Sequence, residues 1–303
     1  MNQVMYFCNM QLLDGKIVSQ QVKLELKAKV ETQVAKGHRA PHLVAVLLGH
    51  NGASETYVAS KIKNCEEIGF KSTLIREEEN VIESRLTDII LELNNKEDVD
   101  GILVQLPLPA HIKEENIINA IDSRKDVDGF SPFNTGLMTL GLPSFIPATP
   151  YGILLMLQHY QIETSGKKAV VIGRSNIVGR PISILLSQAP YNCTVTVCHS
   201  RTKEIASITK EADILIAAIG QPGYVTADMV KENAIVIDVG ITRVPDDSKK
   251  SGFSIKGDVD FKEVADKCSL ITPVPGGVGL MTIGALLKNT YQSYLNHLSL
   301  EDA

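Results

Sequence analysis

The segment Lys168-Ala-Val-Val-Ile-Gly-Arg-Ser-Asn-Ile-Val-Gly-Arg-Pro-Ile-Ser-Ile-Leu-Leu186 carries the signals of a strand, a glycine turn and a helix in succession. Residues 169–172 are apolar and predict a short buried strand, Gly173 ends it, and apolar residues recur at helical spacing from Ile182. Such a unit binds phosphate, because the glycine backbone lets a pyrophosphate approach the positive N-terminal end of the helix. The segment lacks the usual Gly-x-Gly-x-x-Gly pattern, and similar turns occur in α/β domains that bind no ligand. On this segment alone, a dinucleotide site and a purely structural turn both stay open.

A second strand, predicted at 194–198, lies where ribose recognition is expected, about twenty residues beyond the glycines. A cofactor with a free 2′-hydroxyl favours an acidic residue there, but this chain has His199-Ser200-Arg201-Thr202. Hydroxyls and a cation suit a 2′-phosphate, so the sequence favours NADP over NAD, with Arg174 as a second donor. The alternative is a solvated polar turn.

Alternating helix and strand patterns predict an α/β fold with mostly parallel sheets. The elements predicted before residue 131 are helices at 16–36, 54–69 (with Ser54 as N-cap) and 82–93 and strands at 43–48, 70–75 and 101–107. Further strands are predicted at 214–219 and 234–239, and a final helix at 281–298 is expected to pack back on the first domain. We therefore predict two α/β domains with a cleft between them. Residues 1–147 with 281–303 form one domain, and residues 148–280 form a Rossmann-type domain.

Composition and charge indicate which classes of protein this chain does not resemble. The 303 residues suffice for two domains, and the net charge of −5 predicts no general attraction to nucleic acid or to an acidic membrane. Five cysteines without Cys-x-x-Cys spacing indicate thiols in a reducing compartment. The sequence shows no apolar run of membrane-spanning length and no signal-peptide pattern. We expect a cytoplasmic protein that binds neither nucleic acid nor a membrane.

Three polar residues are predicted to converge in the first domain. Tyr57 and Lys61 are four residues apart on one predicted helix, so their side chains are neighbours. Gln105 interrupts an apolar strand near its carboxyl end, and ligands of open α/β sheets gather at that edge. The alternatives are a surface lysine with a tyrosine packed on its stem, and a glutamine that caps a strand.

Two further segments suggest ligand contacts. Asp126 and Asp128 lie in one turn, but a metal site would need more carboxylates, so we expect no metal and a single carboxylate that accepts hydrogen bonds from a ligand. An Asp-Gly turn without a ligand is the alternative. The segment Thr272-Pro-Val-Pro-Gly-Gly-Val-Gly279 combines rigid prolines with glycines, which suits a backbone that approaches a ligand closely.

The chain resembles the bifunctional methylenetetrahydrofolate dehydrogenase/cyclohydrolase family over nearly its whole length. The motifs that carry the resemblance are Tyr57-Val-Ala-Ser-Lys61, Asp100-Gly-Ile-Leu-Val-Gln-Leu-Pro-Leu-Pro109, Lys125-Asp-Val-Asp-Gly129, Gly173-Arg-Ser-Asn-Ile-Val-Gly179, His199-Ser-Arg-Thr202 and Pro273-Val-Pro-Gly-Gly-Val-Gly279. The family has Gly-Arg-Ser as its own variant of the phosphate loop. The resemblance implies two reactions: NADP⁺ oxidises 5,10-methylenetetrahydrofolate to the methenyl cation, and water then converts that cation to 10-formyltetrahydrofolate.

The resemblance also implies roles for individual residues. Lys61 matches the catalytic lysine that shuttles protons, Gln105 is expected to orient it, Tyr57 is expected to contact the folate, and Asp128 is expected to bind the pterin. The residues expected to contact NADP are Gly173, Arg174, Ser175, Ser200, Arg201, Ile241 and Thr282, and those expected to line the substrate side are Pro275, Gly276, Gly277 and Val278.

The resemblance has two departures and leaves two rival functions. Leu280 stands where many relatives have proline, and Ala148 stands where a cysteine is common, so no thiol chemistry is expected there. The rivals are a dehydrogenase without cyclohydrolase activity and an NADP-binding module without turnover. Intact Tyr57, Lys61 and Gln105 argue against both. A homodimer is what the family suggests.

Overall fold

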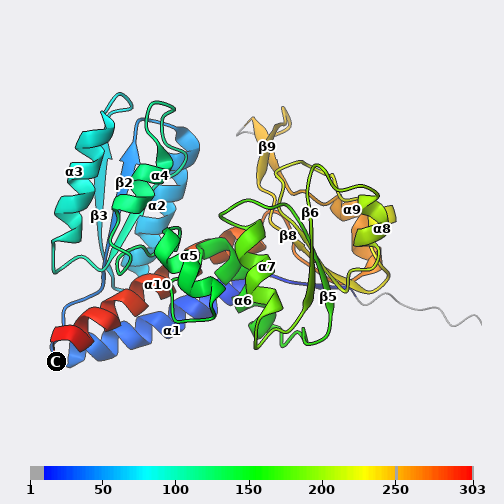
Figure 1. Ribbon diagram of the computed structural model, residues 1–303, viewed down its shortest axis with the longest axis horizontal. Coiled ribbons are helices and arrows are strands. Elements are labelled where there is room, and N and C mark those ends of the chain that lie inside the picture. Colours follow the sequence, from blue (N-terminus) through cyan, green and yellow to red (C-terminus); the bar gives the residue numbers. More distant parts are fainter. Residues whose placement is uncertain (1–9, 250–251, 302–303) are drawn as a thin grey trace, which may run out of the picture. The chain divides into compact units, whose positions relative to one another are not determined.

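The computed structural model describes residues 10–249 and 252–301, which divide into two compact units (Figure 1). Unit 1 contains the residues up to Val18 together with Thr149–Thr282, and unit 2 contains Ser19–Ala148 together with the residues from Ile283 onward. The α/β class with a Rossmann-type unit is confirmed. The cleft between the domains stays a prediction.

Unit 2 is built on a three-stranded parallel sheet with the order β3-β2-β4. Its elements are β2 (His42–Leu48), α2 (Gly52–Glu67), β3 (Lys71–Glu77), α3 (Glu83–Asn94), β4 (Gly101–Val104), α4 (Glu114–Ala120), α5 (Pro132–Thr139) and parts of α1 (Gly15–Ala35) and α10 (Val278–Glu301). Every residue of the central strand β2 is buried, as expected for an apolar strand that is covered on both faces. Helices α3 and α4 pack their apolar residues against one face of this sheet (Figure 1).

Unit 1 contains a six-stranded parallel sheet with the order β1-β11-β8-β7-β5-β6. Its elements are β1 (Gln11–Leu12), α6 (Ala148–His159), β5 (Lys168–Ile172), α7 (Gly179–Ser187), β6 (Thr194–Cys198), α8 (Ile205–Thr209), β7 (Ile214–Ala217), β8 (Ala234–Asp238), β9 (Thr242–Pro245), β10 (Phe253–Lys256), α9 (Phe261–Val264) and β11 (Cys268–Ile271), with short 3-10 turns at Ala227–Met229 and Ala265–Lys267. The strand order reverses at β5, which pairs with β6 on one side and with β7 on the other. This reversal is the point where doubly wound sheets bind dinucleotides.

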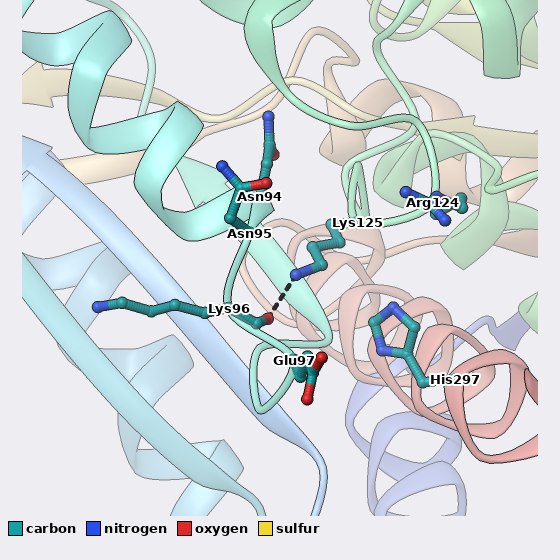
Figure 2. Close-up of a pocket in the computed structure, with 7 residues that line it drawn as sticks. All are labelled: Asn94, Asn95, Lys96, Glu97, Arg124, Lys125 and His297. Atoms are coloured by element: carbon teal, nitrogen blue, oxygen red, sulfur yellow. Dashed lines mark hydrogen bonds between the residues drawn. The ribbon is translucent and has the colours of Figure 1, made fainter. Parts of the chain in front are cut away.

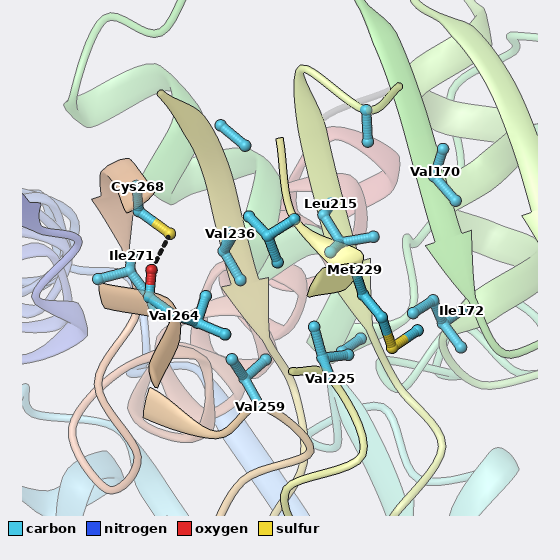
Figure 3. Packing of buried hydrophobic residues seen from close by; sticks show 14 of the residues in the cluster. Val170, Ile172, Leu215, Val225, Met229, Val236, Val259, Val264, Cys268 and Ile271 are labelled. Carbon is cyan, nitrogen blue, oxygen red and sulfur yellow. Dashed lines mark hydrogen bonds between the residues drawn. The ribbon is translucent and has the colours of Figure 1, made fainter. Parts of the chain in front are cut away.

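Apolar residues on one face of this sheet form the core of unit 1 (Figure 3). Val170 on β5, Leu215 on β7 and Val236 on β8 belong to one buried cluster that also contains Val264 of α9. Residues of α8 pack against the same cluster, so α8 and α9 cover this face. Helix α7 lies on the other side of the strands (Figure 1). The sheet thus holds the loops at its carboxyl edge on a rigid base.

Several sequence-based boundaries differ from the structure. Residues 10–18 were expected in the first domain, but β1 pairs in parallel with β11 and therefore belongs to unit 1. Ser54 is not the N-cap of α2, because its own backbone N–H donates to Asn51 Oδ1 at 3.1 Å, and Asn51 precedes the helix. The strand predicted at 101–107 ends at Val104, although the Gln105 N–H still donates to Val46 O at 2.9 Å. Helix α10 begins at Val278 rather than at residue 281.

One feature of the described helices bears on membranes. None of them combines the length and the apolar character that crossing a bilayer requires.

A buried carboxylate ties α10 to the sheet of unit 2. Asp100 is fully buried, and it accepts hydrogen bonds from Arg39 Nη1 (2.7 Å) and Nη2 (2.8 Å), from the His42 N–H (2.8 Å) and from His297 Nδ1 (2.8 Å). Burial alone would raise the pKa of Asp100, but the hydrogen bonds from Arg39, His297 and His42 together lower it below its ordinary value. The ionised carboxylate therefore stabilises the fold.

The pocket beside this carboxylate is organised by a buried lysine (Figure 2). Lys125 Nζ donates to Lys96 O at 2.6 Å and to Leu93 O at 3.2 Å, so the ammonium satisfies carbonyls at the C-terminal end of α3. Arg124 and His297 also line this pocket of about 310 Å³. We interpret Lys125 as a helix cap and assign no ligand to the pocket.

Replacing Asp100 with asparagine is expected to lower the free energy of unfolding by about 3 kcal/mol at neutral pH, because it removes a buried charge that pairs with Arg39. Since the folded-state pKa of Asp100 is lowered, this stabilisation is present above the unfolded-state pKa and is lost as the pH falls through the folded-state pKa. Urea unfolding should therefore show that the free energies of unfolding of variant and wild type differ less at about pH 3 than at about pH 7.

Asp98→Asn is the matched control for this experiment. Asp98 is half exposed and pairs with Lys71 at 2.8 Å on the surface. Its loss is expected to cost less than about 1 kcal/mol. Equal losses for the two variants would contradict the importance assigned to the buried carboxylate.

Candidate active site

Lys61 and Gln105 meet at the carboxyl edge of the sheet in unit 2. Lys61 lies on α2, Gln105 directly follows β4, and Lys61 Nζ donates a hydrogen bond to Gln105 Oε1 at 3.1 Å. The Gln105 backbone N–H donates to Val46 O (2.9 Å), and its Nε2 donates to Leu106 O (2.7 Å). These bonds orient the amide oxygen toward the lysine. The structure thus brings together two of the three residues that were predicted to converge.

The ammonium of Lys61 is held in an unfavourable environment for charge. Burial lowers the pKa of Lys61, and the charge of Asp128 opposes this effect only in part. Cys65, one helical turn further along α2, is buried, and its pKa is raised to about 12, mainly by burial. The thiol is therefore uncharged at neutral pH. A lysine whose pKa is lowered can accept as well as donate a proton near neutral pH.

Asp128 lies in the turn that follows α4, and Asp126 shapes that turn. Buried Asp126 accepts hydrogen bonds from the N–H groups of Ser131 (2.8 Å) and Phe130 (3.2 Å) and from Asn134 Nδ2 (2.9 Å). Burial raises the pKa of Asp128 to about 6, Lys61 lowers it, and Asp126 raises it further. Within the described part of the chain, no hydrogen-bond donor contacts the Asp128 carboxyl group, which leaves it available to a ligand.

Tyr57 takes a different position from the other two predicted residues. It lies one helical turn before Lys61 on α2, and its side chain is 39% exposed. No hydrogen bond joins it to Lys61 or to Gln105 in the described structure. An exposed aromatic ring on this edge can pack against a flat ligand.

The phosphate loop of unit 1 depends on two glycines. Gly173 has a φ of +120°, and a Cβ atom there would collide with the backbone oxygen of Ala218. A Cβ atom on Gly179 would collide with the backbone of Gly173. Ser175 Oγ accepts from the Val178 N–H at 3.2 Å, so the loop folds back onto the beginning of α7. The close approach of backbone to helix N-terminus fits a bound pyrophosphate.

The turn after β6 presents polar groups to solvent. The His199 N–H donates to Thr202 Oγ1 (2.9 Å), and the Thr202 N–H donates to His199 O (2.8 Å). Ser200 and Arg201, at the exposed tip, have no side-chain partner among the described residues. Because β6 is the neighbour of β5, this turn lies beside the phosphate loop, and it contains no carboxylate. The site fits a 2′-phosphate.

The proline- and glycine-rich segment 272–279 packs tightly within unit 1. The Gly15 N–H donates to Gly276 O at 2.9 Å, and a Cβ atom on Gly15 would collide with the backbone of Gly277. Pro275 is exposed, whereas Val278 is buried as the first residue of α10. Of the four predicted substrate-side residues, Pro275 therefore presents the most side-chain surface.

Ile241 lies against the beginning of α10. A Cβ atom on Gly279 would be 2.7 Å from Ile241 Cδ1, and Thr282 Oγ1 donates to Gly279 O at 2.9 Å. Ile241 is still 42% exposed. The structure thus brings two of the predicted cofactor residues, Ile241 and Thr282, to one place in unit 1.

Each of the two units matches a model of a known protein domain. The model of the tetrahydrofolate dehydrogenase/cyclohydrolase catalytic domain matches residues 13–128, and the model of its NAD(P)-binding domain matches residues 147–298. The chain belongs to this family. The resemblance seen in the sequence motifs is confirmed.

Members of the tetrahydrofolate dehydrogenase/cyclohydrolase family resemble the chain over nearly its full length. The bifunctional protein FolD of Bacteroides thetaiotaomicron is 61% identical over 283 residues, which cover 93% of this chain and 97% of that protein. The structure of the bifunctional enzyme FolD, methylenetetrahydrofolate dehydrogenase/cyclohydrolase, from Campylobacter jejuni has a TM-score of 0.90 at 49% identity and covers 95% of this chain and 99% of that one. The Trypanosoma brucei enzyme, complexed with NADP cofactor and inhibitor, has a TM-score of 0.91 at 36% identity, with coverage of 95% and 98%.

Two aspartates of unit 1 were not predicted from the sequence of this family member. Asp238 ends β8 and Asp258 follows β10, and both are buried. For Asp238 the available signal was a polar residue at the end of an apolar strand, as at Gln105, whereas Asp258 follows the partly polar strand β10 and had no such signal. The departures from the family pattern have mild consequences: Leu280 is exposed in the first turn of α10, and Ala148 begins α6.

Proposed function

We propose that this protein oxidises 5,10-methylenetetrahydrofolate to the 5,10-methenyl cation with NADP⁺ and then hydrolyses the cation to 10-formyltetrahydrofolate. Family membership supports both activities. The observation that carries the second activity is the hydrogen bond from Lys61 to Gln105 at the carboxyl edge of the sheet. A cofactor-binding module without turnover would have no use for that pair.

Lys61 supplies the proton transfers that hydrolysis needs. As the neutral amine, it accepts a proton from the water that adds to the methenyl carbon. The resulting ammonium donates that proton to the ring nitrogen when the carbon–nitrogen bond breaks, and the hydroxyl proton of the adduct leaves to solvent. Gln105 keeps Nζ at a fixed place through its carbonyl oxygen. The lowered pKa of Lys61 favours the neutral amine that accepts the first proton.

The remaining predicted residues bind and orient the two ligands. The Asp128 carboxylate is a natural partner for the amino and ring N–H groups of a pterin, and Tyr57 offers an aromatic face. The proposed NADP contacts are Gly173, Arg174, Ser175, Ser200, Arg201, Ile241 and Thr282, and the proposed substrate-side contacts in unit 1 are Pro275, Gly276, Gly277 and Val278. Bound NADP⁺ supplies the acceptor for the hydride, so that the protein's task in the first step is positioning. Family resemblance supports a homodimer, and the cysteine pattern supports a cytoplasmic location.

One assay tests both activities. The purified protein is mixed with 5,10-methylenetetrahydrofolate and NADP⁺, and NADPH and methenyl absorbance are followed together. We expect NADPH to appear while little methenyl compound accumulates. Methenyl accumulation in step with NADPH would identify a dehydrogenase without cyclohydrolase activity, and no reduction of NADP⁺ or NAD⁺ would overturn the assignment as an enzyme.

Arg201→Ala is expected to raise the KM for NADP⁺ about tenfold and to leave the KM for NAD⁺ within about twofold, because the guanidinium pairs with a phosphate that only NADP⁺ carries. Initial rates at varied concentrations of NADP⁺ and of NAD⁺ give the two KM values. Lys203→Ala is the control, since Lys203 is an exposed cation just beyond the same turn. An equal change in the KM values for both cofactors would show that Arg201 does not bind the 2′-phosphate.

A further inference from the structure

Asp258 connects the loop after β7 to the backbone around Gly240. Its carboxylate is fully buried, and Oδ2 accepts hydrogen bonds from the N–H groups of Ile219 at 2.7 Å and Gly220 at 3.1 Å. A Cβ atom on Gly240 would collide with the Asp258 backbone and carboxyl group, so the loop after β8 also packs directly on this side chain. Asp258 therefore contacts both loops at the carboxyl edge.

Asp238 fixes the segment that presents Asp258. Its Oδ1 accepts from the N–H groups of Asp258 (2.8 Å) and Gly240 (2.9 Å), and its Oδ2 accepts from the Val259 N–H (3.0 Å). Burial raises the pKa of Asp238 to about 6 against the effect of these hydrogen bonds, and the charge of Asp258 raises it further. Two carboxyl groups are thus buried next to each other within unit 1.

This arrangement is costly for the fold. Burying neighbouring carboxylates is unfavourable unless their oxygens are well satisfied. Asp258 Oδ1 is buried and has no hydrogen-bond partner in the described part of the structure. The only hydrogen bonds that the Asp258 side chain accepts among those residues are the two from the β7 loop. The Asp258 carboxylate therefore stabilises the conformation of the loop after β7.

The loop is placed where one half of a dinucleotide must bind. The strand order reverses at β5, and a dinucleotide lies across the sheet at that point. The turn at Ser200 and Arg201 beside β6 fits the 2′-phosphate. The nicotinamide half is therefore expected at the carboxyl ends of β7 and β8, on the other side of β5. The loop after β7 already contacts the phosphate loop, because a Cβ atom on Gly173 would collide with Ala218 O.

We propose that Asp258 is a positioning residue for NADP⁺, which holds the backbone of Ile219 and Gly220 in the conformation that receives the nicotinamide half of the cofactor. The proposal rests on the proposed function in taking NADP⁺ as the ligand. Asp258 does not contact the cofactor itself, because its carboxylate is fully buried beneath the loop. Its effect on binding is exerted through the two backbone N–H groups.

The test is the affinity for NADP⁺, measured by titration calorimetry without substrate. Asp258→Ala removes both acceptor bonds and is expected to weaken NADP⁺ binding about thirtyfold. Asp258→Asn keeps a neutral oxygen for both bonds and is expected to weaken binding about fivefold. Hydrolysis of added methenyltetrahydrofolate, which consumes no NADP⁺, is expected to stay within about twofold of wild type in both variants, a separation that general damage to the fold would not give.

Asp260→Ala is the matched control. Asp260 lies two residues further along and also accepts two backbone hydrogen bonds, from Lys262 and Glu263, but it caps α9 instead of holding the β7 loop. Its loss is expected to lower the melting temperature and to leave NADP⁺ affinity unchanged. An Asp258→Asn protein that binds NADP⁺ as wild type does would overturn the proposal, even if Asp258→Ala does not fold. A wild-type protein that binds no NADP⁺ would overturn this proposal and the proposed function together.

Discussion

Lys61→Met is expected to reduce the hydrolysis of 5,10-methenyltetrahydrofolate by about a thousandfold or more, because general acid–base catalysis contributes on this order and methionine has no proton to transfer. The side chain occupies a similar volume, so the fold should be retained. Removing a buried ammonium, whose pKa is lowered by burial, also removes an unfavourable term from the folded state. NADP⁺ affinity should not change, since the proposed cofactor contacts belong to unit 1 and Lys61 belongs to unit 2.

The measurement is the decay of methenyl absorbance at saturating substrate, after correction for the uncatalysed reaction. Lys63→Met is the matched control: Lys63 lies on the same helix two residues further along, is exposed, and points away from Gln105 by the helical periodicity. It should hydrolyse at the wild-type rate. A Lys61→Met protein that retains a tenth of wild-type hydrolysis would show that another group moves the proton, with the Asp128 carboxyl, of pKa about 6, as the next candidate.

Inner strands such as β2, β5 and β7 were predictable because burial on both faces leaves a continuous apolar run. Strand β6 was predicted with its observed bounds, and the strand predicted at 169–172 differs from β5 by one residue. Strand β1 has only two residues, too few for any periodic pattern, and its partner β11 lies near the other end of the chain. The antiparallel pair of β9 and β10 was missed because its residues are mostly polar or half-exposed.

In the candidate site, too, sequence patterns revealed individual residues but not the contacts between distant segments. Gln105 was found because a polar residue at the end of an apolar strand is conspicuous, and the helical spacing of Tyr57 and Lys61 suggested neighbours. The hydrogen bond between Lys61 and Gln105 follows from the pairing of β2 with β4, which residue patterns do not specify. Asp258 acts through backbone N–H groups of a distant loop, and backbone groups carry no sequence signal.

Gly173→Ala is expected to weaken NADP⁺ binding about a hundredfold or more and to abolish dehydrogenase turnover at ordinary cofactor concentrations. Two physical effects combine at this position. An L-residue is strained at a φ of +120°, by about 1–3 kcal/mol, and the added methyl group collides with Ala218 O, a backbone atom that cannot rotate away. The phosphate loop must then move relative to the loop after β7, which disturbs the N-terminal end of α7 where the pyrophosphate is proposed to bind.

Gly166→Ala separates these two effects. Gly166 also has a positive φ, of +72°, but a Cβ atom there would meet no atom within 4 Å, so this variant carries backbone strain without a collision. It should lose stability in thermal unfolding and keep its NADP⁺ affinity, whereas Gly173→Ala should lose both. Methenyl hydrolysis should persist in each protein because Lys61, Gln105 and Asp128 belong to the other unit. If Gly173→Ala binds NADP⁺ within threefold of wild type, the turn after β5 is structural and the pyrophosphate binds elsewhere.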